Sequence, residues 1–184
     1  MSTTTKWSLD DTHSEVHFKV KHMMISTVTG QFSRFSSSIE TIGEDFTTAK
    51  IQFTADVDSI STNNAQRDAH LKNGDFFDVP NYPQITFRSS KVVRVDQENY
   101  KVHGDLTMRG VTKEIVLDVE FGGIMQDPWG NTRAGFTLSG KINRHDFAIS
   151  FGGVTETGGL LLGDEVKINA NAEFVKETAL VEAQ

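Results

Sequence analysis

The sequence predicts an all-β fold, an eight-stranded antiparallel barrel with one short α-helical cap at about residues 64–73. Apolar and polar residues alternate with a period of two in repeated runs, and turn residues separate these runs. There are about eight runs, and only one segment has the features of a helix. Because 184 residues suit one domain with a sizeable core, we expect residues 1–184 to form a single domain with short flexible termini.

The predicted strands follow one another along most of the chain. In the first, Val16, Phe18 and Val20 alternate with polar residues, so their side chains share one face. The second covers residues 28–42 and contains Gly30. The other runs have the apolar positions Ile51/Phe53/Ala55/Val57, Ile85/Phe87, Tyr100/Val102/Gly104/Leu106, Ile115/Leu117/Val119/Phe121, Ala134/Phe136/Leu138/Gly140/Ile142 and Val166/Ile168/Ala170/Ala172/Phe174.

One short helix is predicted between the third and fourth strands. Asn63 or Asn64 can cap its N-terminus, and residues 65–72 contain no helix breaker. Gly74 stands where a left-handed residue commonly ends a helix. We therefore expect the helix to stop just before Gly74.

The stretch DFFDVPNYPQITF, residues 75–87, follows this helix directly. Phe76 and Phe77 come first, and Pro80 and Pro83 stiffen the passage into the next strand. The stretch therefore predicts a lid or plug rather than a hairpin.

The interior of the fold depends on how the strands close. Strands with one apolar face pack as two sheets or close on themselves, and a closed eight-stranded barrel is filled by side chains or holds one small ligand. The inward positions mix aromatic and small residues: Phe18, Phe53, Phe87, Phe136, Phe174, Ala55, Gly104, Ala134, Gly140, Ala170 and Ala172. Because small inward residues leave space, we expect a phenylalanine-walled cavity covered at one end by the helix, Phe76 and Phe77. Alternatively, the small residues fit the taper of the barrel or let strands bend.

Composition excludes several classes of function. With 18 Lys and Arg against 25 Asp and Glu, the net charge of -7 argues against binding nucleic acid or lying on an anionic bilayer. Without cysteine there is no disulfide, thiolate metal site or cysteine nucleophile. The N-terminal residues MSTTTKWSLDDTHSEV lack the features of a secretory signal, and no apolar run reaches the length of a spanning helix, so we expect a soluble cytoplasmic protein.

The short motifs predict neither a phosphate-binding loop nor a metal site. GFTLSGKI, residues 135–142, nearly matches a phosphate-binding loop, but Ile142 replaces the required Ser or Thr and the strand alternation continues through it. On one strand, His17 and His22 would face opposite sides, whereas His13 and His17 would lie roughly 13 Å apart. The histidines therefore offer no clean pair of metal ligands.

No catalytic residues are predicted. A G-x-S-x-G nucleophile motif is missing, and the carboxylates form no evident pair. His145 and Asp146 follow Asn143 and Arg144 in a predicted turn, where we favour surface hydrogen bonding over a catalytic dyad. His70 lies on the predicted helix. In the DPWGN turn, residues 127–131, Trp129 either forms part of a tight connection or contacts a partner or membrane.

Five sequence blocks, taken together, resemble the YceI-like proteins in order and spacing over about residues 6–175. They are WSLDDTHSEVHFKVKHM, HLKNGDFFDVPNYPQITF, GDLTMRGVTKEIVLDVEF, DPWGNTRAGFTLSGKINRHDFAI and ETGGLLLGDEVKINANAEF. The resemblance implies a lipocalin-like barrel with a helical cap and an apolar channel that takes polyisoprenoid lipids or isoprenoid quinones. It also implies a possible homodimer, and many relatives are periplasmic with a leader. The chain departs from the family pattern at Ala148, where glycine is usual, and in the following residues 150–153.

We accordingly expect non-catalytic binding, storage or transport of a long isoprenoid lipid, with no cofactor, no metal and no nucleic acid, and with transient membrane contact. The expected channel-lining residues are Phe18, Val20, Phe32, Phe53, Ala55, Leu71, Phe76, Phe77, Ile85, Phe87, Leu106, Phe136, Leu138 and Phe147. We expect residues 64–78 to gate the channel.

Two alternatives stay open. One is a protein-interaction module that presents the 127–131 loop or the 155–163 segment TETGGLLLG on a tightly packed barrel. The other is an enzyme acting on a prenyl lipid, with His145 and Asp146 or His70 as proton-transfer residues.

Overall fold

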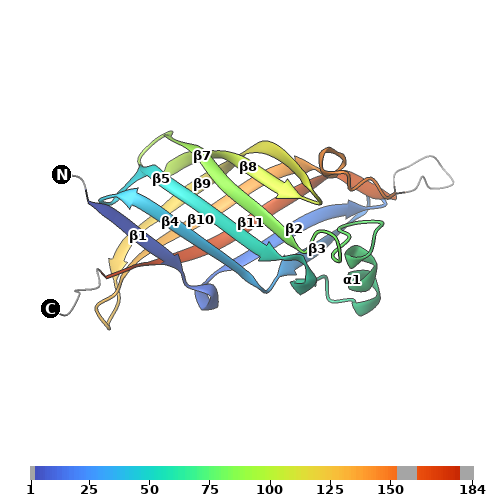
Figure 1. Ribbon diagram of the computed structural model, residues 1–184, viewed down its shortest axis with the longest axis horizontal. Coiled ribbons are helices and arrows are strands. Elements are labelled where there is room, and N and C mark those ends of the chain that lie inside the picture. The colour runs from blue at the N-terminus through green and yellow to red at the C-terminus, as the bar shows by residue number, and fades with distance from the viewer. Residues whose placement is uncertain (1–2, 153–160, 179–184) are drawn as a thin grey trace.

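The alternating segments form one antiparallel sheet that closes on itself as an elongated barrel (Figure 1). The computed structural model describes residues 3–152 and 161–178. Its strands are β1 (Thr4–Leu9), β2 (Glu15–His22), β3 (Ser26–Phe32), β4 (Phe35–Ile42), β5 (Asp45–Asp56), β6 (Ile60–Ser61), β7 (Gln84–Arg94), β8 (Asn99–Met108), β9 (Val111–Gln126), β10 (Thr132–Asn143) and β11 (Leu162–Lys176). Its helices are α1 (Ala65–Lys72) and the 3-10 turns η1 (Asp11–His13), η2 (Val57–Ser59) and η3 (Arg144–Phe147).

The barrel closes because β11 pairs with both halves of a broken first strand. Near its C-terminal end β11 pairs with β1, where Trp7 lies opposite Lys176, and nearer its start it pairs with β2, where Val166 lies opposite Val20. The strands β3/β4 and β5/β6 are broken in the same way, so eleven strands occupy eight positions in the wall. The predicted eight-stranded antiparallel barrel with one short helix is thus confirmed.

The breaks in the strands were not predicted. Residues 28–42, expected to be one strand, form β3 and β4 with a bend at Ser33 and Arg34. At this bend the Arg34 backbone N–H donates to Ser59 Oγ (3.0 Å). Because a side-chain oxygen takes this donor, the ladder hydrogen bonds stop there and the chain changes direction.

The cap helix begins as predicted and ends differently. The Asn64 side chain accepts a hydrogen bond from the Arg67 N–H (3.0 Å), which confirms the N-cap. The prediction of a left-handed Gly74 is wrong: Gly74 is not among the positive-φ residues, and the left-handed residue is Asp78, with φ 54. The chain instead folds back under the helix, and the Phe77 N–H donates to the Leu71 carbonyl (3.0 Å). A helix carbonyl is satisfied in this way without a glycine.

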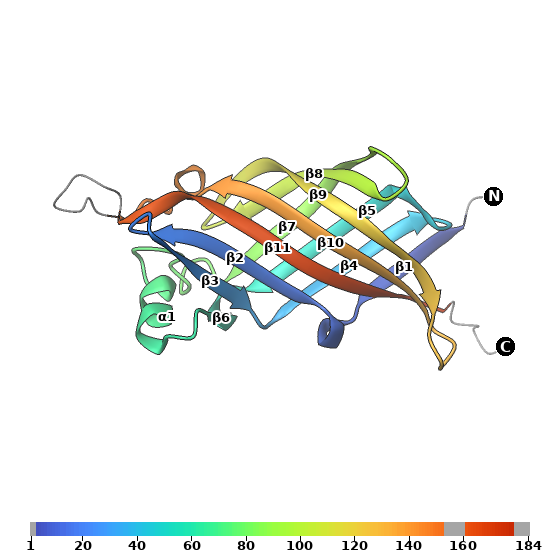
Figure 2. The ribbon, with the colours of Figure 1, turned by 180° about the vertical axis from the view of Figure 1, so that it is seen from behind.

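Two apolar clusters make up the interior of the barrel. The cluster at the end where the termini lie contains the buried residues Trp7, Ile39, Phe46, Tyr100, Ala134 and Phe174. The other cluster surrounds the middle of the barrel and extends to Phe76 beneath α1 at the opposite end (Figure 2). No helix within residues 3–152 and 161–178 is long and apolar enough to span a membrane.

We predict that Trp7→Ala lowers the free energy of unfolding by about 3–5 kcal/mol, because Trp7 is 1% exposed and its Nε1 donates to Thr41 Oγ1 (3.0 Å). Chemical denaturation followed by circular dichroism measures this difference. The control is Trp129→Ala, which changes a residue that is 82% exposed and should alter stability by no more than about 0.5 kcal/mol. Equal losses in the two variants would contradict the assignment of Trp7 to the core.

Candidate ligand-binding cavity

A cavity of about 510 Å³ lies inside the barrel and is lined by members of both apolar clusters. Thirteen of the fourteen residues predicted to line a channel lie on its wall: Phe18, Val20, Phe32, Phe53, Ala55, Leu71, Phe76, Phe77, Ile85, Phe87, Leu106, Phe136 and Leu138. Leu71, Phe76 and Phe77 come from the cap, and the others come from strands. The size is within the range of about 300–1,000 Å³ that is usual for small-molecule sites.

Phe147 does not line the cavity. It lies in η3 with an exposure of 1% and belongs to the buried cluster around the cavity, where it packs behind the wall. The 3-10 turn explains the difference, because strand alternation does not extend into η3 and gives no direction for a side chain there. Phe147 therefore has a packing role at the rim.

The small inward residues act in two different ways. The glycines make room for aromatic rings: a Cβ on Gly30 would lie 2.1 Å from the Phe18 ring, and one on Gly104 would lie 2.5 Å from the Phe87 ring. Ala55 and Ala170, in contrast, border the cavity itself. The free volume therefore results from alanines on the wall, while the glycine positions are filled by neighbouring side chains.

The end of the cavity towards the chain termini is closed by aromatic rings. Phe46 lies at the centre of this group, with ring centroids 5.2 Å from Trp7, 5.2 Å from Phe121 and 5.1 Å from Phe136. Sequence alternation missed Phe46 because the pairing of β4 with β5 shifts register between Glu40 and Ile42. A register shift exchanges the inward and outward faces of a strand, so Phe46 points inward out of phase with the later residues of β5.

The opposite end of the cavity lies under the cap. The rings of His70, Phe76 and Phe151 form a triangle with each centroid 5.0 Å from the other two. His70 Nε2 is 2.9 Å from Asp75 Oδ2, which braces the helix against the loop that follows it. Phe151 is 40% exposed and also lines the cavity, so the cavity reaches the surface at this triangle.

Two arginines hold the chain around this opening. Arg109 donates from Nη1 to the Ala148 carbonyl (2.7 Å) and from Nη2 to the Gly74 carbonyl (2.8 Å), and thus joins the cap to the turn after η3. Arg144 is 5% exposed and donates to the carbonyls of Gly163 (2.9 Å) and Ile149 (3.0 Å). Burial lowers the pKa of Arg144, and the backbone carbonyls provide the hydrogen bonds that its guanidinium requires.

The turn that Arg109 holds contains Ala148, where the resemblance leads us to expect a glycine. Ala148 has φ 59, a left-handed conformation that glycine adopts more easily. The neighbouring segment 150–153 is described only as far as residue 152. The segment 155–163, which the alternative of a protein-interaction module would present to a partner, lies largely outside the described residues.

The His145–Asp146 dyad, which the sequence left open only as an alternative, is not formed. His145 Nε2 is 2.7 Å from Asp164 Oδ1 on β11, and its partner is therefore not Asp146. His145 is not among the residues that line the cavity. Only His70, of the two histidines considered for proton transfer, lies at the cavity.

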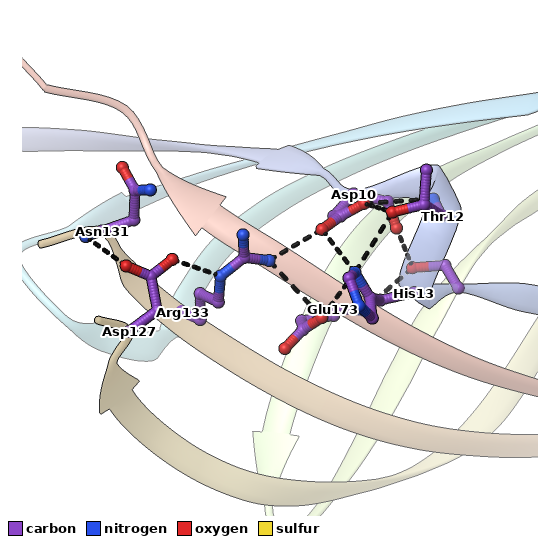
Figure 3. A network of polar contacts seen from close by, with 8 residues as sticks. Asp10, Thr12, His13, Asp127, Asn131, Arg133 and Glu173 are labelled. Atoms are coloured by element: carbon purple, nitrogen blue, oxygen red, sulfur yellow. Dashed lines mark hydrogen bonds and ion pairs between the residues drawn. The ribbon is translucent and has the colours of Figure 1, made fainter. Parts of the chain in front are cut away.

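A polar network joins β1, β10 and β11 outside the cavity (Figure 3). The Arg133 guanidinium lies 2.8 Å from Asp127, 2.7 Å from Asp10 and 3.5 Å from Glu173. Asp10 also caps η1 by accepting from the Thr12 N–H (3.1 Å). The network fixes the break between β1 and β2 to the hairpin that joins β9 and β10.

Asp10, His13 and Glu173 in this network have ligand atoms within 4.8 Å of one another, a spacing compatible with a metal ion. The sequence did not predict this group, since its members come from distant parts of the chain. Arg133 already supplies the positive charge that the two carboxylates require. We therefore interpret the group as an ion-pair network of the fold.

Comparisons with known proteins agree with this architecture. A family model described as a YceI-like domain matches residues 7–174. A UPF0312 protein of Staphylococcus aureus strain N315 is 43% identical over 171 residues, which are 92% of this chain and 97% of that protein. Among solved structures, a Campylobacter jejuni YceI protein has a TM-score of 0.74 at 36% identity, covering 86% of this chain and 90% of that one. Burkholderia cenocepacia BcnA has a TM-score of 0.76 at 25% identity, covering 90% and 98%.

A more distant structure shares the fold alone. A polyisoprenoid binding domain from Saccharophagus degradans has a TM-score of 0.69 at 18% identity and covers 93% of this chain and 98% of that chain.

We predict that Arg133 contributes to the loss of folding stability at acid pH. Its hydrogen bond lowers the pKa of Asp127 to about 2, and hydrogen bonds from Thr12 and Arg133 lower that of Asp10 well below 3.8. Because the folded pKa values lie below the unfolded ones, the stabilisation is present above about pH 4 and is lost as the pH falls towards 2. Arg133→Met should flatten this dependence in denaturation curves from pH 2 to 6, whereas Arg88→Met, at an exposed site, should leave it unchanged. If the free energy of unfolding falls equally with pH in wild type, Arg133→Met and Arg88→Met, this role of Arg133 is refuted.

Proposed function

The chain belongs to the family of YceI-like domains, and from that premise we propose that it binds a long isoprenoid lipid, a polyprenyl lipid or isoprenoid quinone, in the barrel cavity. One observation carries the proposal: a cavity of about 510 Å³, lined mainly by aromatic and aliphatic side chains, is plugged at one end and reaches the surface at the other. The Saccharophagus degradans domain, described as polyisoprenoid binding, has the same fold.

The polarity of the wall fits a ligand with a long apolar tail and a small polar end. Most of the wall is apolar, whereas Arg67, His70 and Arg144 line the cavity at the cap end. Arg67 Nε donates to Thr62 Oγ1 (2.7 Å), so its guanidinium is held in place. A ligand that enters tail first would leave its headgroup beside these side chains.

The energetics of tail burial suit a carrier or a store. Burial of each methylene contributes about 0.8 kcal/mol, so a five-carbon isoprene unit contributes roughly 3–4 kcal/mol relative to water, before the costs of binding. Relative to a bilayer, the same tail gains little on transfer into the cavity. Loading and unloading are then nearly balanced, and their rates depend on how easily the opening widens.

We propose residues 64–78 as the gate. This segment covers the opening through α1 and through Phe76 and Phe77, and Phe77 packs edge-on to Phe32 of β3 (6.4 Å between centroids). Few backbone hydrogen bonds anchor the segment to the wall, and Arg109 forms the polar clip between Gly74 and Ala148.

The interaction-module alternative requires a tightly packed interior, which does not fit a cavity of this size.

We predict that Ala170→Phe reduces the affinity for a radiolabelled polyprenol at least tenfold, because the new ring occupies space in the cavity. Equilibrium binding measures the effect, and denaturation checks that the variant is folded. Lys167→Leu is the matched control, since Lys167 is exposed on the same strand. A wild-type protein that takes up no polyprenol, or a folded Ala170→Phe variant with unchanged affinity, would contradict the proposal.

If residues 64–78 are the gate, Arg109→Ala should accelerate release of the bound polyprenol several-fold. The free energy of unfolding should change by only about 1 kcal/mol or less, because the Arg109 clip joins two surface segments. A competition assay that follows the release rate measures this. Arg94→Ala is the control, since Arg94 contacts the Asp96 carbonyl (3.0 Å) at the other end of the barrel. Equal release rates in wild type and Arg109→Ala would exclude the clip as part of the gate.

A further inference from the structure

The turn between β2 and β3 exposes three consecutive apolar side chains beside the opening of the cavity. Met23 is 39% exposed, Met24 is 55% exposed and Ile25 is 80% exposed. Their hairpin lies at the same end of the barrel as α1, away from both termini (Figures 1 and 2). Exposed apolar residues grouped at one tip mark a contact surface more often than isolated ones do.

The backbone of this tip is held in a costly conformation. The Ile25 N–H donates to the His22 carbonyl (3.2 Å), and both central residues of the turn have positive φ, 52 for Met23 and 60 for Met24. Asn and Gly adopt this conformation with much less strain, and hairpins with two such residues normally use them. Two methionines at these positions favour a role for their side chains, because strain of this kind is concentrated at functional sites.

The hairpin also differs in charge from the rest of the protein. The chain has a net charge of -7, but β2 and β3 carry Lys19 and Lys21 and, from residue 16 to residue 39, no acidic residue. Acidic groups on the neighbouring strand are paired elsewhere: Asp164 with His145 (2.7 Å) and Glu165 with Lys141 (3.5 Å). An anionic surface would therefore repel most of the molecule and attract this hairpin.

The tip is continuous with the wall of the cavity. The Met23 N–H donates to the Leu161 carbonyl (2.9 Å), and Leu161 lines the cavity. His22, which precedes the tip, and Phe151, in the triangle beneath the cap, line it as well. A surface that holds the tip thus lies next to the opening.

We propose that the β2–β3 hairpin docks the protein on an anionic lipid bilayer, with Met23, Met24 and Ile25 in the acyl region and Lys19 and Lys21 near the headgroups. The inference rests on the proposed function, because it brings the opening of the cavity to the source of the lipid. Three side chains are too few for a stable protein interface of about 800 Å² per partner, whereas a small apolar tip with adjacent basic residues suits interfacial insertion. The net charge of -7 still argues against the whole molecule lying flat on an anionic bilayer, and it limits contact to the hairpin, where residues 16–39 contain no acidic residue.

Flotation of the full-length protein with phosphatidylcholine vesicles, with and without phosphatidylserine, tests the proposal. Wild type should float with the anionic vesicles, and Met24→Glu/Ile25→Glu should reduce the bound fraction about tenfold or more. Trp129→Glu is the matched control, since Trp129 is 82% exposed and belongs to the β9–β10 hairpin, which lies at the opposite end of the barrel (Figure 1), so the bound fraction should not change. Lys19→Ala/Lys21→Ala should weaken binding several-fold and reduce its dependence on salt.

The proposal is overturned if wild type does not float with the anionic vesicles. It is also overturned if Trp129→Glu reduces the bound fraction as much as Met24→Glu/Ile25→Glu does, or if Met24→Glu/Ile25→Glu keeps the full bound fraction. Binding of a short-chain polyprenol without vesicles, measured on the same variants, separates this inference from the proposed function. Retained polyprenol binding in Met24→Glu/Ile25→Glu, together with lost flotation, supports the docking surface. If no protein binds polyprenol but the effect of the hairpin variant on flotation persists, the proposed function fails and the docking surface stands.

Discussion

The pairing of β11 with both halves of the broken first strand is the constraint on which the rest of the structure depends. Because β11 reaches β1 at one end and β2 at the other, the wall closes although its first strand is interrupted at Asp10. Closure leaves no free edge along this seam and fixes which side chains face inward. The Arg133 network then holds the interruption in place from outside.

The side chains of the closed wall leave space in the middle of the barrel. Aromatic rings around Phe46 fill one end, and the cap covers the other with Phe76 and Phe77. Between them, Ala55 and Ala170 leave a cavity whose wall is mainly apolar. An apolar ligand tail would restore the contacts that this space lacks, so one geometric feature explains both the shape of the interior and the proposed ligand.

Periodic features of the sequence were predictable, and features that interrupt a period were not. Strand alternation located most of the wall and ten of the lining residues, and Asn64 identified the start of the cap, which supplies Leu71, Phe76 and Phe77. Phe46 was missed because a register shift interrupts the alternation, and Phe147 was placed wrongly because it lies in a 3-10 turn. The Arg133 network and the Arg109 clip join residues far apart in the chain, and only the fold brings them together.

The central claim is that the cavity holds an isoprenoid lipid. Native mass spectrometry of the purified protein, combined with analysis of its organic extract, tests this claim most directly. We predict one prenyl lipid or quinone per protein molecule, lost from the complex on denaturation. A protein that is empty as purified and remains empty after incubation with prenyl lipids would contradict the claim.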